Sequence, residues 1–533
     1  MNTRLVFISL LLVAACAASA LADGATCSAL AAKSFGSEVK IESATLVPAT
    51  SQAPEHCDVR GVIAPEAKFA VKLPTNWNNR FYMVGGGGFA GQLSLGPMNA
   101  GLQKGYATAT TDTGHDAAKE PLGAFAERRA DNPNADRKKL DYAYLAVHNT
   151  AALAKQIISA YYSRAPKYSY WIGCSTGGRQ GLMEAQRYPE DFDGYVIGAP
   201  VLKISHEGIR GIWNAQAVST GAGAVSYDKL PLLAEAVYKK CDGADGLLDG
   251  LITDPRRCDF DPLKDLDRCL VEAEDRDCFT WAQLQGLKKV YDGVRNSKGV
   301  LLYPGQPPGA EIAANGRSGW VGSIGGDGGM GLVFGESTMR FLAFEPQRGK
   351  DWNWKQFNFD TDPPQMEAFS KMIDAINPDL SKVKKRGGKI IHYHGWADAL
   401  VNPQMSVDYY ESALKKMGDK QTKEFYKLYL VPGMFHCAGG VGCDRADWFT
   451  PLVEWVEKGV APGALNGSRV EKGETVRTRP LCAYPEIARY NGQGDINKAE
   501  NFTCATPSTI NAASDKSTAR QPRREGKKQK RST

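Results

Sequence analysis

Apolar positions follow two different rhythms along residues 60–200. Short runs rich in β-branched and aromatic residues predict strands. Two longer stretches, 140–162 and 177–189, carry apolar residues every three or four positions, which predicts helices, the second ending at Pro189. Strands that alternate with helices predict an α/β fold with a mostly parallel central sheet. The predicted strands are FAVKL (69–73), RFYMV (80–84), YATATT (106–111), YSYWIG (168–173) and YVIGAP (195–200).

The same strand pattern returns at 389–398 and 425–436, but residues 201–380 lack it. That region is rich in cysteine, then in glycine, proline and aromatic residues, which suggests a large lid domain inserted into the sheet. A chain of 533 residues is also longer than one hydrophobic core usually supports. The predicted parts are a signal peptide (1–22), the first part of the α/β domain (23–200), the inserted lid (201–380), the second part with a C-terminal appendage (381–505) and a basic disordered tail (506–533).

Both ends of the chain differ in composition from its body. Arg4 and the following apolar run, too short to span a bilayer, predict a secretory signal cleaved near Ala20 or Ala22. A second interpretation is a bacterial lipobox ending at Cys16, which would tether the protein through lipid. The last 14 residues carry seven basic residues and one acidic residue and so account for the formal charge of +6. The body is therefore nearly neutral, which predicts no nucleic-acid surface, and no later stretch suits a membrane helix. The tail is expected to be solvated, with binding to an anionic surface as the alternative.

Export would permit disulfides. Without Cys16, eleven of the 12 cysteines remain, so at least one has no partner in the chain. Three pairs would close short loops: Cys241–Cys258, Cys269–Cys278 and Cys482–Cys504. Cys174 and Cys437 have no such near partner.

Residues 173–177 form a G-x-S-x-G pentapeptide centred on Ser175. The motif alone is weak evidence, because chance matches are common in glycine-rich chains. Here it stands between a predicted strand and a predicted helix, which is the context of a nucleophile elbow. We therefore expect Ser175 to be a nucleophile.

A serine nucleophile needs a histidine base and an acid that orients it. In this architecture the acid and then the histidine follow the serine along the chain. Asp398 and His436 each follow a predicted late strand and fit these places. His392 and His394 precede the acid on one face of their strand, so we expect them to pack behind the site; a zinc-binding pair is the alternative. His436 could also be a purely structural histidine.

Ser175 and His436 each have a cysteine beside them in the sequence. Cys174 precedes Ser175, and Cys437 follows His436. If the serine and the histidine meet, the two sulfurs come close enough to bond. The resulting disulfide would fasten the nucleophile turn to the loop of the base.

With these motifs the chain resembles the tannase and feruloyl esterase family of α/β-hydrolases, whose signature is a Cys-Ser, Asp, His-Cys arrangement. GCSTGGRQG, HGWADALV and PGMFHCAGG stand in the family's order, and the resemblance extends over about residues 25–505. It implies an α/β-hydrolase with a lid, and the catalytic residues Ser175, Asp398 and His436. The family pattern offers no partner for Cys443, which is the free thiol if Cys27 pairs with Cys57.

Ester hydrolysis requires backbone N–H groups that bind the oxyanion. Thr176, the residue after the nucleophile, is expected to give one, and the resemblance implies that Gly87 or Gly88 gives the other. The same glycine loop also matches G-x-G-x-x-G with Asp112 about twenty residues on, the pattern of a dinucleotide-binding oxidoreductase. Export, and the lack of a helix directly after Gly91, argue against that alternative.

Residues 241–251, CDGADGLLDGL, hold three carboxylates among glycines. Oxygen ligands at this spacing suit calcium, although Thr253 stands where an EF-hand would have its glutamate. On composition alone a polar surface turn is an equal alternative. The resemblance implies a structural calcium loop in the lid, with the carboxylates of Asp242, Asp245 and Asp249 and the carbonyls of Leu247 and Leu251 as ligands.

The sequence therefore predicts a secreted or periplasmic serine esterase that hydrolyses feruloyl or galloyl esters through an acyl-enzyme and carries structural calcium. A member of the family hydrolyses terephthalate monoesters, so the identity of the aromatic ester stays open. A binding protein without activity on this fold is the alternative from a different class. The expected partner is a small aromatic ester, and no oligomeric state is predicted. Candidates for the acid pocket are lid aromatics, although more of them are expected to be core: Trp213, Trp320, Phe334, Phe341, Trp352 and Trp354.

Overall fold

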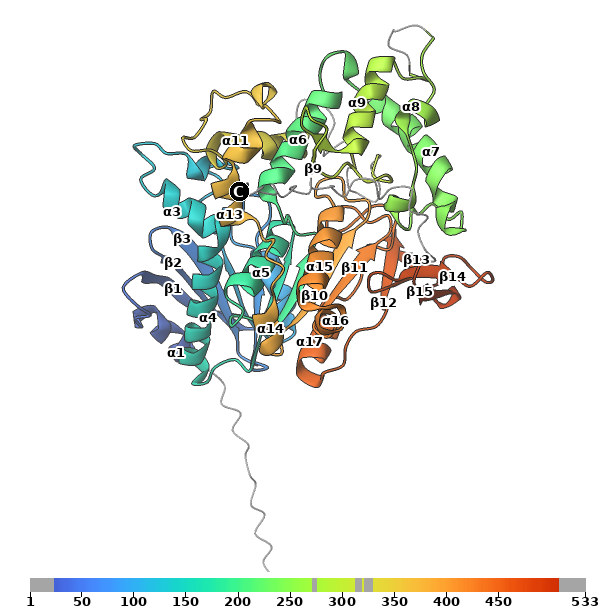
Figure 1. Ribbon diagram of the computed structural model, residues 1–533. Helices are drawn as coiled ribbons and strands as arrows, with labels where there is room; N and C mark the ends of the chain where they lie inside the picture. The colour runs from blue at the N-terminus through green and yellow to red at the C-terminus, as the bar shows by residue number, and fades with distance from the viewer. Residues whose placement is uncertain (1–23, 271–275, 312–318, 321–328, 508–533) are drawn as a thin grey trace, which may run out of the picture.

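The computed structural model describes residues 24–270, 276–311, 319–320 and 329–507. Its described strands build a main sheet of nine, in the order β1-β2-β3-β5-β4-β6-β7-β10-β11 (Figure 1). From β5 to β11 all neighbours are parallel, whereas β1, β2, β3 and β5 pair antiparallel. The fold is therefore α/β with a mainly parallel sheet. The strands of this sheet are β1 (Val39–Val47), β2 (His56–Ile63), β3 (Ala67–Pro74), β4 (Arg80–Val84), β5 (Ala107–Thr111), β6 (Tyr168–Cys174), β7 (Gly194–Gly198), β10 (Lys389–Gly395) and β11 (Tyr426–Val431).

Helices cover both faces of the sheet, and a separate apolar cluster seals each face. The larger cluster holds apolar residues of α4, α5 and α15, such as Ile157, Met183 and Tyr410. The other face is covered by α2 and α17 through Met98 and Trp455. Burial on both faces explains why β4 and β7 carry nearly continuous apolar runs rather than alternating polar and apolar residues.

Helices outside the lid are α1 (Gly24–Ala29), α2 (Leu95–Gln103), α3 (Ala135–Leu140), α4 (Ala146–Tyr162), α5 (Thr176–Arg187), α15 (Gln404–Met417), α16 (Asp419–Lys423) and α17 (Phe449–Lys458). In the described residues between β7 and β10 the helices are α6 (Ile204–Val218), α7 (Leu230–Cys241), α8 (Pro262–Asp265), α9 (Trp281–Asp292), α11 (Met330–Phe341), α12 (Asp362–Gln365), α13 (Glu367–Ile373) and α14 (Ser381–Lys385). Within the described ranges no helix is both long enough and apolar enough to cross a bilayer.

The region between β7 and β10 lies over one end of the sheet, where α6, α7, α9 and α11 gather (Figure 1). It has its own core, in which Leu233 and Val237 of α7 pack with Leu284 and Leu287 of α9. The same core takes in Phe435, from the loop after β11. This region is called the lid below. It also contains the short hairpin of β8 (Val294–Arg295) and β9 (Leu301–Tyr303).

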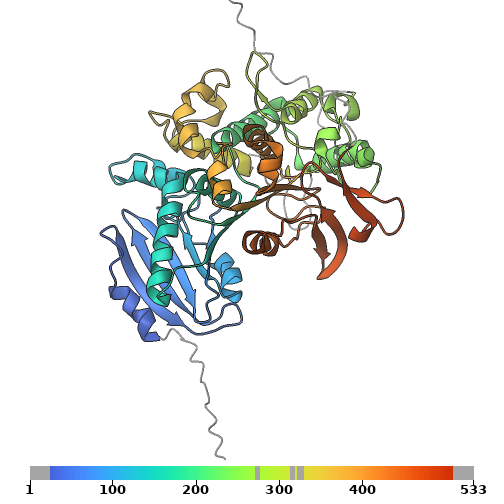
Figure 2. The same ribbon diagram turned by 60° about the horizontal axis from the view of Figure 1, so that its bottom comes forward.

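The C-terminal appendage consists of two antiparallel strand pairs, β12–β13 and β14–β15. Figures 1 and 2 both show these strands, in red, beside the green helices of the lid. An ion pair joins the two parts, because Arg479 Nη2 lies 2.5 Å from Asp249 Oδ2. The strands are β12 (Leu465–Glu471), β13 (Glu474–Leu481), β14 (Ile487–Tyr490) and β15 (Phe502–Ala505).

The strands that sequence patterns predict are present, each within two residues of the expected bounds, as β3 to β7. The predicted helix at 140–162 is α4, preceded by a π-helical turn over Asp141–Leu145. The prediction lacked β1 and β2, and with them the antiparallel edge of the sheet. The proposed signal, the lipobox cysteine and nearly all of the basic tail lie outside the described residues.

Candidate active site

Ser175 stands at the turn between β6 and α5. Its φ of 62° and ψ of −123° lie in a region that residues with a side chain rarely adopt, as a nucleophile turn requires. A Cβ on Gly173 would come within 2.4 Å of the Gly177 backbone, so only glycine lets the strand and the helix approach so closely. The Ser175 N–H donates to the Gly198 carbonyl over 2.9 Å, which anchors the turn to β7.

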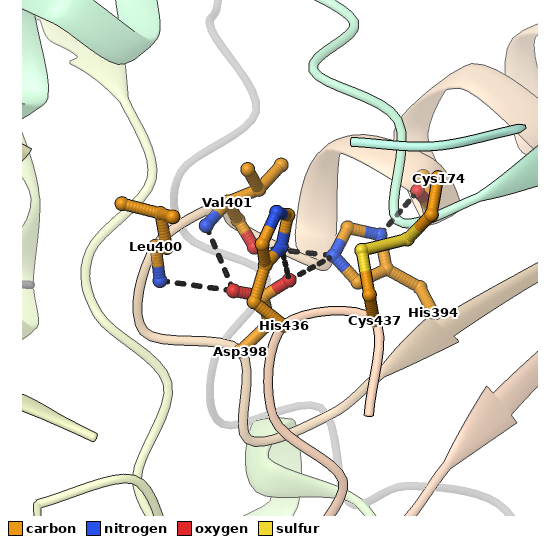
Figure 3. Close-up of a disulfide and its surroundings, with 8 residues drawn as sticks. Cys174, His394, Asp398, Leu400, Val401, His436 and Cys437 are labelled. Carbon is orange, nitrogen blue, oxygen red and sulfur yellow. Dashed lines mark hydrogen bonds and ion pairs between the residues drawn. A yellow bond between two sulfur atoms is a disulfide. The ribbon is translucent and has the colours of Figure 1, made fainter. Parts of the chain in front are cut away.

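Asp398 follows β10 and is fully buried. Its Oδ2 accepts a hydrogen bond from His436 Nδ1 over 2.7 Å, and its Oδ1 accepts from the N–H groups of Leu400 and Val401 (Figure 3). Burial alone would raise the pKa of Asp398, but attraction to His436 and hydrogen bonds from His394 and His436 lower it overall. The carboxylate is therefore ionised and fixes the orientation of the His436 ring.

The disulfide Cys174–Cys437 joins the two loops that carry Ser175 and His436 (Figure 3). Its Cα atoms are 6.1 Å apart, although the two cysteines are separated by 263 positions in the sequence. Because Ser175 follows one cysteine and His436 precedes the other, the bond brings the strained turn and the histidine loop to the same place.

A buried chain of hydrogen bonds continues behind Asp398. His394 Nε2 lies 3.1 Å from both Asp398 Oδ2 and the Val401 carbonyl, which only accept, so this nitrogen carries the proton. His394 Nδ1 then accepts from the Ser406 hydroxyl over 2.7 Å. Ser406 in turn accepts from His392 Nε2, and His392 Nδ1 accepts from the Tyr426 hydroxyl.

This chain decides the role of the two strand histidines. All four ring nitrogens have protein partners, so the alternative of a zinc pair loses its ligands. Burial, and then the neighbouring His394, lower the pKa of His392 well below its ordinary value, which keeps it neutral. His394 supports the carboxylate that holds His436.

A mostly apolar pocket opens beside Ser175. Of the six lid aromatics considered above, Phe334 alone lines it, and its ring meets Phe89 edge-on with centroids 5.6 Å apart. Trp320 instead packs against Tyr291 in the lid core. The residues that line the cavity are Gly88, Phe89, Tyr142, Ser175, Thr176, Val201, Ile204, Glu207, Gly208, Arg210, Gly331, Phe334, Thr338, Leu400 and Val401.

Two charged residues of α6, Glu207 and Arg210, lie in the wall of this cavity. The guanidinium of Arg210 pairs with Glu207 and donates to Gln306 and to the carbonyls of Ala399 and Leu400. Glu207 accepts from Arg210 on one oxygen and from the Tyr303 hydroxyl on the other. The arginine thus has its donors engaged, whereas the glutamate keeps lone pairs for another donor.

No local sequence pattern pointed to this pair. Glu207 and Arg210 are three positions apart on a helix, a spacing that is typical of an ordinary surface ion pair. Their partners lie at 303–306 and 399–400, and no local pattern predicts that those segments meet.

The glycine loop approaches the same site. Gly88 has φ of +54° and lines the cavity with Ser175 and Thr176, whereas Gly87 is exposed and does not. The Thr176 hydroxyl donates to the Gly88 carbonyl over 2.6 Å, and so does the Tyr142 hydroxyl over 3.1 Å. Of the two glycines, the geometry favours Gly88 beside the nucleophile.

The dinucleotide alternative does not fit this geometry. The helix that follows the loop, α2, begins only at Leu95. Asp112 is 2% exposed, and its Oδ1 accepts from the N–H groups of Lys68 and Gly114. Its carboxylate therefore joins β3 to the segment after β5 and is not available to a ribose.

The aspartate loop of the lid lies against the C-terminal appendage. Asp245, Leu247, Asp249 and Leu251 line one solvent-open cavity together, while Asp242 Oδ1 accepts from the N–H groups of residues 249–251. Asp249 is also paired with Arg479, and burial raises its pKa despite that partner. The oxygen-rich donor set fits a hard cation such as calcium, although the arginine already neutralises one carboxylate.

Five disulfides are present in the described residues: Cys27–Cys57, Cys174–Cys437, Cys241–Cys258, Cys269–Cys278 and Cys482–Cys504. Each is a pair that the sequence analysis gives. Cys443 is the described cysteine without a bond; it is buried, and burial raises the pKa of its thiol to about 11. This thiol is therefore protonated and unreactive in the folded protein.

The comparisons with known proteins agree with this geometry. Residues 51–505 match the family described as tannase and feruloyl esterase. The chain is 35% identical to mono(2-hydroxyethyl) terephthalate hydrolase of Piscinibacter sakaiensis, over 86% of this chain and 87% of the relative. It is 34% identical to a probable feruloyl esterase of Arthroderma benhamiae, over 81% of each. Feruloyl esterase B of Aspergillus oryzae superposes with a TM-score of 0.79 at 26% identity, over 90% of this chain and all of that one.

A mainly parallel sheet with a serine at a strained strand-to-helix turn defines the class of α/β-hydrolases. Within that class, the chain belongs to the tannase and feruloyl esterase family and is a carboxylic ester hydrolase.

Proposed function

We propose that the protein is a secreted serine esterase that hydrolyses esters of phenolic acids through an acyl-enzyme. The observation that carries this proposal is the disulfide Cys174–Cys437, which ties the strained Ser175 turn to the loop of the His436–Asp398 pair. The five disulfides support export, because such bonds persist in oxidising compartments.

In the proposed reaction, Ser175 Oγ attacks the ester carbonyl carbon while His436 takes the hydroxyl proton. The C–O bond to the alcohol breaks, and His436 returns the proton to the leaving oxygen. Water then attacks the acyl-enzyme with His436 again as base, which releases the acid and restores the serine. Asp398 keeps its charge throughout and stabilises the imidazolium.

The negative charge on the carbonyl oxygen needs donors that are in place before the reaction. We assign this role to the backbone N–H groups of Thr176 and Gly88, with Gly87 as the weaker candidate. The bonds that the Gly88 carbonyl accepts from Thr176 and Tyr142 support the assignment, because they hold the residue that carries the donor N–H beside Ser175.

The acid part of the ester would occupy the apolar cavity, where Glu207 would accept a hydrogen bond from it. A phenolic hydroxyl could donate to the carboxylate of Glu207, which would leave no polar group unpaired. Phe334 and Phe89 would pack against the aromatic ring. This favours a ring with a free hydroxyl, as in feruloyl and galloyl esters.

A terephthalate monoester is the second candidate, favoured by the 35% identity to a hydrolase named for that substrate. Its free carboxylate would need a cation in the pocket. In the described lining, Arg210 has its donors engaged and Glu207 would repel a second carboxylate. We therefore rank the phenolic esters first.

Calcium is proposed as a structural ion of the lid. Asp242, Asp245 and Asp249 would hold it through carboxylates, and Leu247 and Leu251 through backbone carbonyls. The ion would brace the contact between the lid and the appendage and would take no part in the reaction.

The test compares wild type with Ser175→Ala on methyl ferulate, methyl gallate, mono(2-hydroxyethyl) terephthalate and p-nitrophenyl acetate. The expected result is a preference for a phenolic ester and a loss in the variant on the order of 10⁶-fold. A preference for the terephthalate ester would overturn the substrate ranking but keep the mechanism. A serine-directed phosphonate that fails to label Ser175 would defeat the esterase proposal in favour of a silent binding protein.

A further inference from the structure

Three side chains able to bind a metal gather away from the active site, between α4, α5 and β7. They are His148 of α4, Glu184 of α5 and Asp191 in the segment after α5. One ligand atom from each lies within 4.8 Å of the other two. None of the three lines the cavity at Ser175.

Glu184 is the unusual member of this cluster. Its side chain is fully buried, and neither carboxylate oxygen has a hydrogen-bond partner among the described residues. Asp191, a second carboxylate, is also buried, at 6% exposure. Two carboxylates held together without water cannot both stay charged unless a cation neutralises them.

The neighbouring Lys155 and His148 pair with Asp191 but not with Glu184. Lys155 Nζ is 3.7 Å from Asp191 Oδ1, and no ion pair joins it to Glu184. His148 Nδ1 meets Asp191 Oδ2 at 2.6 Å, and its ring is held flat against Tyr188 with centroids 3.7 Å apart. The fully buried Tyr195 hydroxyl, on the neighbouring strand β7, also lacks a partner among the described residues.

We propose that His148, Glu184 and Asp191 form a binding site for a divalent transition-metal ion of the zinc type. One imidazole and two carboxylates match the ligands and the open fourth position that zinc accepts, whereas calcium prefers oxygen ligands alone. The His148 side chain is 27% exposed, which gives an ion and a water ligand a path to the cluster. The metal would join α4 to α5, the helix that begins at the nucleophile turn.

A proton is the competing occupant. If Glu184 is protonated and donates to Asp191, the cluster is satisfied without a metal. The two occupants make different predictions for Glu184→Gln: an amide can replace a protonated acid, but it binds zinc poorly.

The experiment uses the whole protein, stripped with a chelator and returned to excess calcium so that the aspartate loop is saturated. Zinc chloride is then titrated calorimetrically into wild type, Glu184→Gln and His148→Gln. The matched control is His206→Gln, which changes a partly exposed histidine of the lid that bonds Ser205. Zinc-edge anomalous diffraction from crystals of the wild type locates the bound ion.

The expected result is one zinc per wild-type chain with a Kd on the order of 1 μM or tighter. Both cluster variants should bind at least about 100-fold more weakly, and the control should match wild type. If Glu184→Gln fails to fold, His148→Gln decides. The proposal is overturned if wild type binds no zinc, if the cluster variants bind as wild type does, or if the anomalous peak lies elsewhere; Glu184 then carries a proton.

Discussion

The loops at the end of the sheet and the wall of the lid meet at one cavity, but they are held in different ways. Ser175 directly follows β6, and Asp398 and His436 lie in the loops after β10 and β11. A disulfide and a buried carboxylate join these loops. Glu207 and Arg210 of the lid depend instead on contacts with residues about 90 to 190 positions away. The difference suggests that the sheet and its loops fix the groups proposed to act on the ester bond. The position of the lid would instead determine which acid part of an ester the cavity accepts.

The largest expected effect is on the sheet side, at the acid of the proposed triad. Asp398→Asn keeps the size of the side chain but removes the charge that orients His436. We expect kcat to fall about 10⁴-fold with little change in KM. Steady-state kinetics on methyl ferulate checks this, and a loss below tenfold would contradict the role given to Asp398.

The next largest effect is expected for the disulfide at the active site, and a disulfide within the lid serves as the comparison. Replacing Cys174 and Cys437 together by alanine should lower the free energy of unfolding by about 2–5 kcal/mol and also lower kcat. The matched control removes Cys269–Cys278, which spans only 9 positions within the lid. Urea unfolding and kinetics on both double variants are the measurement. Equal kcat in the two would mean that the long bond stabilises the fold without positioning the site.

On the lid side, Glu207→Gln should change selectivity more than turnover. Losing a charge-assisted hydrogen bond to a phenol should lower kcat/KM for methyl ferulate by about 10- to 100-fold. Methyl 3,4-dimethoxycinnamate, which has no free hydroxyl, should be hydrolysed as before. Glu336→Gln, which removes an ion pair with Arg340 on α11, serves as control. An equal loss on both esters would show that Glu207 acts only through packing.

Removal of calcium should lower the thermal stability of the protein by loosening the lid and should leave the mechanism of ester hydrolysis unchanged. A chelator should lower the Tm by about 2–6 °C, as expected when a ligand well above its Kd is removed. Asp242→Asn should abolish the dependence on calcium, and Asp116→Asn, at a partly exposed site outside the lid, should preserve it. Scanning calorimetry with and without calcium is the check; a calcium-independent Tm would make the loop a polar turn.

The smallest expected effect is on the pH dependence of stability, through one buried acid from each region. Burial raises the pKa of Asp112, at the sheet, to about 7, and it raises that of Glu311, in the lid, to about 7 as well. Their contribution to stability is full below their ordinary values of 3.8 and 4.5 and is lost as the pH rises through 7. Asp398 acts in the opposite sense: its pKa is lowered, so its contribution is lost as the pH falls below its ordinary value of 3.8.

Stability should therefore decline between about pH 4 and pH 7. Asp112→Asn and Glu311→Gln should each flatten the profile, by about 1–3 °C in Tm. Tm measured across this range in wild type and both variants gives the test. A rise in Tm toward pH 7 would contradict the raised pKa of both acids.

The sequence predicted the sheet side far better than the lid. Ser175 lies in a motif whose strand, turn and helix are contiguous, and Asp398 and His436 each follow a strand with a clear apolar pattern. The pairing of Cys174 with Cys437 could be inferred because two adjacencies coincided. Glu207 and Arg210 gave no comparable signal, since their partners come from two distant segments, 303–306 and 399–400.

Two other features could not be predicted from local sequence patterns. The antiparallel edge formed by β1 and β2 was missed, because an alternation of strands and helices predicts only the parallel part of a sheet. The ion pair between Asp249 and Arg479 joins residues 230 positions apart, so the contact of the aspartate loop with the appendage could not be read from the loop itself.

The disulfide between Cys174 and Cys437 also has a topological consequence. It closes a covalent ring that contains the whole lid, because every residue from β7 to β10 lies between its two cysteines. A protease that cuts the chain once within the lid therefore leaves a single molecule, with Ser175 on one fragment and His436 and Asp398 on the other, still linked beside the site. Such a nicked enzyme would run as one band on a non-reducing gel and as two after reduction.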